Sequence, residues 1–280
     1  MAWLQQLNVE KFLLFTLVLT RVSGLTMTAP IYGTKDVPAR VRTFLAVALA
    51  MLIAPSQWNV DVAYPETTLN YLVFIGSELL IGLCLGLGIT ILFSGVHLAG
   101  QMIGRISGMM LADVFDPTLE TEVPTLSRML FMVTLAAFVC LGGHRIVMGG
   151  LLDTFQTIPP GSLLPWRVPG FQTPSAGGFE GTIPGTFVLL LTQSFYLGIR
   201  AAVPVVTALL LSTLVMGLIS RTLPQLNILM VGFGMNAMLT FAIFWLTIGA
   251  AAMLFQPQVS AAMETLLEAL QVQSYDQWTS

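Results

Sequence analysis

Side chains that commonly carry out catalysis are scarce in this 280-residue chain. His97 and His144 are the only histidines, and neither has a metal-ligating partner at motif spacing. The sequence holds no HExxH, GxSxG or Walker A motif and no paired carboxylates. We therefore expect no catalytic residues, no cofactor and no metal, so the chain is predicted not to be an enzyme. Satisfied or interfacial histidines are favoured over a metal ligand or a general base.

Two cysteines, Cys84 and Cys140, each lie inside an apolar stretch. Isolated cysteines in such surroundings are typical of small buried hydrophobic side chains. A disulfide or a metal ion held by the pair is the alternative interpretation.

Three charged residues lie well inside apolar runs, namely Arg21, Glu78 and Arg200. A charge in hydrocarbon costs several kcal/mol unless it is paired or hydrated. Glu78 is therefore expected to pair with Arg21 or Arg200 across helices, and a charge swap is then predicted to restore assembly. Alternatively, these groups line an aqueous path, extend to the interface or face a polar contact with another subunit.

The composition explains why these charges stand out. Charged residues are 9% of the chain, against about 25% in soluble domains, and 55% of the chain is apolar. The mean hydropathy is +0.84, and a net charge of −3 provides no basic surface for nucleic acid. The composition argues against a soluble enzyme, a nucleic-acid-binding protein and a disordered scaffold, and it predicts an integral membrane protein or a core subunit of a membrane assembly.

The elements that must position these residues are apolar runs at 12–33, 43–55, 69–112, 129–151, 184–219 and 226–255. A membrane span needs about 20 residues, so the first, fourth and sixth runs are predicted to be single helices. The second run is short and ends at Pro55. The two longest runs are expected to break, at glycines in one and at Pro204 in the other. The predicted fold is all-α: a polytopic membrane domain over 1–255, with long, partly broken helices and helical hairpins.

The segment 256–280 differs in pattern and is predicted to be an amphipathic tail helix with Ser260 as its N-cap. Its apolar face recurs at helical spacing and holds Met263, Leu266, Leu267 and Leu270. An ordinary surface helix and a docking helix for a partner subunit both fit this pattern.

Glycines four residues apart form one GxxxG pair, at Gly82 and Gly86, and two GxxxG patterns in series, at Gly100, Gly104 and Gly108. Small residues at this spacing let helix backbones approach closely within a membrane. Helix packing is the simplest interpretation, and the triplet on one face also favours contact with another subunit.

The stretch 105–128 is the most unusual local feature, because it combines bulky apolar residues with a turn at Asp116-Pro117. Bulky, flexible side chains suit the reversible closing of a hole; they are Met109, Met110, Leu111 and Phe115. A connecting loop with no gating role is the alternative.

Several motifs in order resemble the FliR/SctT/SpaR family of type III secretion export-gate subunits, over roughly residues 20–255. They are Arg21-Val-Ser-Gly24 with Pro30, Val37-Pro-Ala-Arg40-Val-Arg42, Pro55, Glu78 with Gly82 and Gly86, Gly100–Gly108 leading to Phe115-Asp-Pro117, and Ser220-Arg221-Thr-Leu-Pro224-Gln-Leu-Asn227. One departure lies at Val231-Gly-Phe-Gly-Met-Asn236, because the family usually has a proline after Gly-Phe.

The resemblance implies a non-enzymatic core subunit of the flagellar export gate, multi-pass in the bacterial inner membrane at the flagellar basal body. The implied partners are FliP and FliQ within the gate, FlhB, unfolded flagellar export substrates and membrane lipids, with no nucleic acid. The positions at about 107–122 match the family's pore plug. An injectisome homologue is the alternative function, and a small-solute secondary transporter is a further one.

Overall fold

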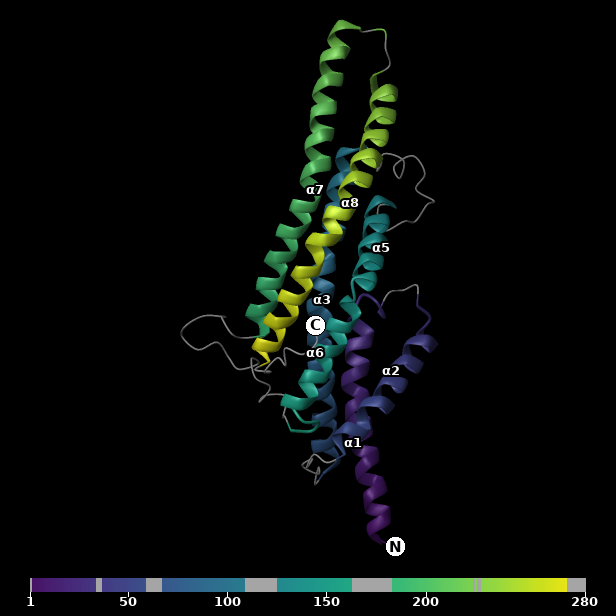
Figure 1. Ribbon diagram of the computed structural model, residues 1–280, viewed down its shortest axis with the longest axis vertical. Coiled ribbons are helices and arrows are strands. Elements are labelled where there is room, and N and C mark those ends of the chain that lie inside the picture. The colour runs from purple at the N-terminus through teal and green to yellow at the C-terminus, as the bar shows by residue number, and fades with distance from the viewer. Residues whose placement is uncertain are drawn as a thin grey trace. The chain divides into compact units, whose positions relative to one another are not determined.

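The fold is described from a computed structural model that covers residues 2–33, 37–58, 67–108, 125–162, 183–223, 225 and 228–270. Every regular element in these ranges is a helix (Figure 1). In chain order they are α1 (Ala2–Thr28), α2 (Ala39–Ile53), the short 3-10 helix η1 (Ala54–Gln57), α3 (Thr68–Ile106), α5 (Thr125–Cys140), α6 (Gly143–Thr157), α7 (Ile183–Thr222) and α8 (Ile228–Ala269).

Four stretches within the described residues are long and apolar enough to cross a membrane: Val9–Thr28, Ala39–Gln57, Thr68–Ile106 and Ile183–Thr222. A fifth crossing results if α5 and α6 together form one broken span. The predicted all-α, polytopic membrane fold is therefore confirmed.

The prediction that the two longest apolar runs are broken is wrong. α3 is one helix of 39 residues, and α7 is one helix of 40 residues that continues through Pro204. At a rise of 1.5 Å per residue their axes measure about 58 and 60 Å, roughly twice the thickness of the hydrocarbon core. The expectation failed because it took the bilayer thickness as the limit on helix length.

The break lies instead in the run 129–151, which was predicted to be a single helix. α5 ends at Cys140 and α6 begins at Gly143, with Gly142 in the left-handed region at φ +80°. That conformation is costly for any residue with a Cβ atom. A single glycine therefore ends one apolar helix and allows the next to begin.

The described part of the C-terminal segment, up to Leu270, lies in and directly after α8, and Ser260 is not an N-cap. α8 runs without interruption through Pro257 and Ser260 to Ala269. The predicted apolar face is buried, while Glu264 and Glu268 are exposed. The division between 1–255 and 256–280 stays a prediction, although the helix itself is continuous across residue 256.

Compact packing groups the chain into two units. Unit 1 consists of Met1–Ile91, Gly142–Leu190 and Val259–Ser280, and unit 2 consists of Leu92–Leu141 and Leu191–Gln258. In unit 1 the end of α8 packs on α3 and α6, where the side chains of Leu266 and Met263 fill the space beside Gly88 and Gly150.

In unit 2 an aromatic cluster and small residues hold the helices together. The ring of Phe93 meets Phe131 and Phe138 edge-on, with 5.6 Å between ring centroids in each pair. The hydroxyls of Ser94 on α3 and Ser194 on α7 are 3.1 Å apart. α7 and α8 are joined by a hydrogen bond of 2.8 Å from Ser212 Oγ to the side-chain oxygen of Asn236.

Glycines bring the backbones of α1 and α3 into direct contact in unit 1. A Cβ atom on Gly82 would overlap the carbonyl oxygen of Arg21, and one on Gly24 would lie 2.8 Å from the carbonyl oxygen of Leu79. A Cβ atom on Gly86 would overlap the side-chain hydroxyl of Thr28 and lie 3.0 Å from the carbonyl oxygen of Leu25. The Gly82–Gly86 pattern therefore marks a helix crossing inside this chain.

We predict that Gly82→Ala lowers the free energy of unfolding by about 1–3 kcal/mol, because backbone atoms cannot yield to the added methyl group. Gly76→Ala on the same helix is the matched control, since nothing lies within 4 Å of a Cβ atom there. The control should be neutral or stabilising by up to about 1 kcal/mol. Thermal unfolding of the purified chain in mild detergent measures both, and equal effects would contradict the prediction.

Candidate functional site: the buried Arg21–Glu78 network

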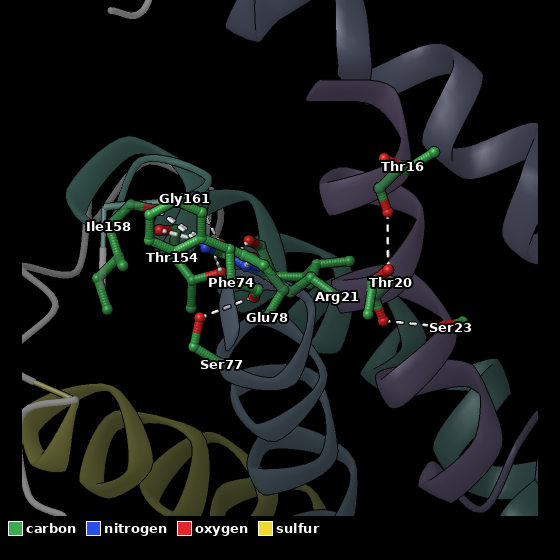
Figure 2. Close-up of polar contacts among 11 residues, drawn as sticks. Thr16, Thr20, Arg21, Ser23, Phe74, Ser77, Glu78, Thr154, Ile158 and Gly161 are labelled. Atoms are coloured by element: carbon green, nitrogen blue, oxygen red, sulfur yellow. Dashed lines mark hydrogen bonds and ion pairs between the residues drawn. The ribbon is translucent and has the colours of Figure 1, made fainter. Parts of the chain in front are cut away.

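A buried ion pair joins α1 and α3 in unit 1 (Figure 2). Arg21 Nε donates to Glu78 Oε2 at 2.6 Å, and the two side chains are 0% and 1% exposed. Arg21 lies in the buried stripe of α1, whose other members are Leu14, Leu17, Val18, Val22 and Leu25. Glu78 therefore pairs with Arg21, one of the two partners that the sequence predicts.

The guanidinium of Arg21 also caps the C-terminus of α6. Nη1 donates to the carbonyl oxygens of Thr154 and Ile158, and Nη2 donates to Ile158 O, each at 3.1 Å. The last carbonyls of a helix carry partial negative charge, so a cation stabilises them even where a backbone N–H also donates, as Ile158 N–H does to Thr154 O. The guanidinium carbon also lies 4.3 Å from the ring centroid of Phe155, at cation–π distance.

The second carboxylate oxygen of Glu78 binds the turn that follows α6. Glu78 Oε1 accepts a hydrogen bond of 2.9 Å from the backbone N–H of Gly161. Gly161 has φ +75°, a conformation that glycine adopts at little cost. The carboxylate is thus held between a guanidinium and a backbone amide, so both of its oxygens are satisfied.

We call Arg21, Glu78, Thr154, Ile158 and Gly161 the buried ion-pair network. Burying two charges is favourable only when good geometry and further hydrogen bonds offset the loss of hydration. The network meets that condition with groups from α1, α3, α6 and the turn after α6. The network is therefore electrically neutral, and its role in this chain is to hold these elements together.

Arg200, the third predicted intramembrane charge, lies elsewhere. It is exposed on α7, and the part of the chain that the structure describes offers it no ion pair. Only two of the three charges are therefore brought together.

The second glycine pattern is only partly a packing surface. A Cβ atom on Gly100 would overlap Ser127 on α5, and Gly104 is buried within α3. Gly108, by contrast, lies beyond the end of α3 with φ +78°. The prediction of three glycines on one helical face is therefore wrong for Gly108, which adopts a conformation that ends the helix.

The histidines and cysteines lie at separate positions of the helices, and Nδ1 of His144 is buried without a hydrogen-bond partner in the described part of the chain. His97 stacks on Phe131 at 4.6 Å between centroids, and its carbonyl accepts a hydrogen bond from Ser127 Oγ at 3.0 Å. His144 is half-buried in the first turn of α6. Cys84 is buried, but Cys140, the last residue of α5, is exposed, contrary to expectation. Both thiols are free, and no metal-binding group of three residues occurs among the described residues.

The motif residues lie at helix ends where they are described. Arg40 and Arg42 are in the first turn of α2, with Arg42 Nη2 donating to Val37 O at 3.4 Å, and Arg221 is in the last turn of α7. Several predicted residues lie outside the described residues: Met109, Met110, Leu111, Phe115, Asp116, Pro117, Pro224 and Asn227. Their assignment to a plug or a motif stays a prediction.

Sequence reasoning missed the backbone partners of the network and a second close helix crossing. A Cβ atom on Gly198 of α7 would overlap the carbonyl oxygen of Gly95 on α3. The Ser194-x-x-x-Gly198 spacing is a small-residue pattern that could have indicated this crossing. The carbonyls of Thr154 and Ile158 have no comparable signature, because every residue carries a carbonyl.

We predict that Glu78→Gln or Arg21→Met lowers the free energy of unfolding by about 3–5 kcal/mol, because each leaves one buried charge without its counterion. Arg21→Met combined with Glu78→Leu should be less damaging than the sum of the two single changes. Unfolding of the purified variants in mild detergent measures these differences.

The structure reverses the expectation for a charge swap. With Arg21→Glu and Glu78→Arg together, the new carboxylate would face the carbonyl oxygens of Thr154 and Ile158, and the new guanidinium would face the N–H of Gly161. We therefore expect the swapped chain to remain destabilised. Recovery of the original stability by the swap would show that the ion pair acts without α6.

With this geometry established, comparison with known proteins identifies the family. Residues 12–262 match the family described as bacterial export proteins, family 1. The flagellar biosynthetic protein FliR of Escherichia coli (strain K12) is 34% identical over 231 residues, which cover 82% of this chain and 80% of that relative. The proteins of the same name from Aquifex aeolicus (strain VF5) and Bacillus subtilis (strain 168) are 28% and 26% identical, over 85% and 92% of this chain and 87% and 95% of each relative. The chain, with its ion pair inside the matched region, therefore belongs to family 1 of the bacterial export proteins.

Proposed function

We propose that the chain is a membrane-embedded structural subunit of the bacterial flagellar protein export apparatus. The observation that carries the proposal is the family match over residues 12–262. The similar relatives named above are called flagellar biosynthetic proteins, and the match spans most of their length. Their names favour the flagellum over an injectisome.

The exposed surface of α7 supports a role as one subunit among several. Within unit 2, large apolar side chains are exposed on α7 from Leu191 to Leu218, a length of about 40 Å. The hydrocarbon core is about 30 Å thick. Because this apolar surface is longer than the hydrocarbon core is thick, lipid tails alone would not cover it. Neighbouring protein subunits together with lipid would cover it.

The finer roles follow from the family resemblance. The chain acts without catalysis in the inner membrane, where it assembles with FliP and FliQ, contacts FlhB and helps to form the passage for unfolded flagellar proteins. The segment at about 107–122 closes that passage. A narrow pore lined by apolar side chains excludes water and ions, and soft packing lets an entering polypeptide displace the plug.

We predict that cells without this chain make no flagellar filament and do not swim, and that restoring the gene restores both. Affinity purification of the tagged chain in mild detergent should recover a large complex containing other small membrane subunits. Normal swimming with loss of an injectisome would favour the injectisome alternative. Recovery of the chain alone, or as a homo-oligomer with no export defect, would favour the solute transporter.

Deletion of Met110–Leu119 tests the plug. We expect the complex to assemble at its normal level, because the deleted segment does not include the buried ion-pair network. We also expect the cells to become leaky to small ions, since the apolar barrier is gone. Membrane potential and ion efflux provide the measurement, and unchanged permeability in cells with an assembled complex would refute the plug.

A further inference from the structure

Arg200 has an unusual environment on α7. It is exposed, and its neighbours along the same helix are large and also exposed: Tyr196 by 64%, Ile199 by 48% and Val203 by 47%. A cation thus projects from a surface that is otherwise largely apolar. A solvated helix face would carry many charges, but the nearest described charge on α7 is Arg221.

The chain itself does not neutralise this cation. The side chain of Arg200 has no hydrogen bond or ion pair within the part of the chain that the structure describes. It is the eighteenth residue of α7, so about 25 Å of helix precedes it and more follows. That distance is longer than a side chain can span, so the guanidinium does not reach either end of the helix.

The backbone carbonyl of Arg200 also lacks its usual hydrogen-bond partner in the helix. Pro204 lies inside α7 and has no N–H to donate to the carbonyl of Arg200, one turn earlier. The nearby hydroxyl of Thr207 is used within its own helix, where it donates to Val203 O at 2.8 Å and contacts Pro204 O at 3.1 Å. Proline is tolerated in membrane helices where a neighbouring protein segment satisfies the freed carbonyl.

These observations decide which kind of surface covers Arg200. Lipid tails provide no counter-charge, and an aqueous path would be expected to have polar rather than apolar walls around the guanidinium. An apolar protein surface that carries one carboxylate satisfies both the cation and its surroundings, because guanidinium and carboxylate pair in a planar, two-bond geometry.

We propose that Arg200 forms an intersubunit ion pair with an Asp or Glu on an apolar helix of a different membrane subunit of the export apparatus. This inference rests on the proposed function and names the chemistry of the partner at one position. The pair would fix the register of the partner helix along α7, because a desolvated cation tolerates no other position of the carboxylate.

The experiment uses the tagged full-length chain in cells that contain the whole apparatus. Arg200→Glu and Arg200→Gln should each reduce the recovery of partner subunits by about tenfold or more, while Arg200→Lys retains most of it. A partner subunit in which one carboxylate is changed to Lys or Arg should restore recovery with Arg200→Glu but not with Arg200→Gln. Arg145→Gln, at an exposed arginine of α6 that lies outside the motifs quoted above, is the control and should leave recovery unchanged.

Three results would overturn the inference: normal recovery with Arg200→Gln, compensating changes only within this chain, or rapid labelling of Tyr196→Cys, one turn before an intact Arg200, by a membrane-impermeant maleimide in the assembled complex. The labelling is done with Cys140→Ser, which removes the exposed native thiol. Thermal unfolding of the purified variants separates loss of the partner from loss of the fold. If the unmodified chain recovers no partner subunits, the proposed function itself fails. If the unmodified chain and the Arg200 variants recover partner subunits equally well, the ion pair alone is refuted.

Discussion

The need to neutralise one buried cation governs the packing of unit 1. Arg21 lies in the apolar stripe of α1, where its charge has no access to water. Glu78 supplies the counter-charge, the end of α6 supplies carbonyl oxygens, and Gly161 satisfies the remaining carboxylate oxygen. Each of these groups satisfies a different charge or hydrogen-bonding atom of the same ion pair. The ion pair therefore holds α1, α3 and α6 together.

Close backbone contact makes this arrangement sterically accessible. The glycines of α1 and α3 let the two helices touch, so that Glu78 reaches Arg21 with a short hydrogen bond. Unit 2 uses the same principle with Gly95 and Gly198, but it joins α3 to α7 through serine hydroxyls and no buried ion pair is described there. Small residues therefore determine which helices pack against each other, while the ion pair fixes the orientation of the contact between α1 and α3.

The sequence predicts much of this fold because its physical signals are local. Low charge and long apolar runs indicate membrane helices, and an Arg and a Glu inside such runs indicate a pair. The choice between Arg21 and Arg200 as the partner of Glu78 depends on tertiary packing, which one sequence does not contain. The unbroken length of α3 and α7 was missed because a span was equated with a bilayer, and the role of Ile158 was missed because backbone carbonyls leave no trace in residue type.

The sequence separations within the network bear on biosynthesis. The ion pair joins residues 57 positions apart, and the carbonyl of Ile158 lies 137 positions after Arg21. A ribosome that has made α1 has therefore made a cation whose carboxylate partner arrives 57 residues later, and whose carbonyl partner at Ile158 arrives a further 80 residues after that (137 − 57). The complete set of partners exists only once Gly161 has been added, so the first helix reaches its final neutralised environment after more than half of the chain has been synthesised.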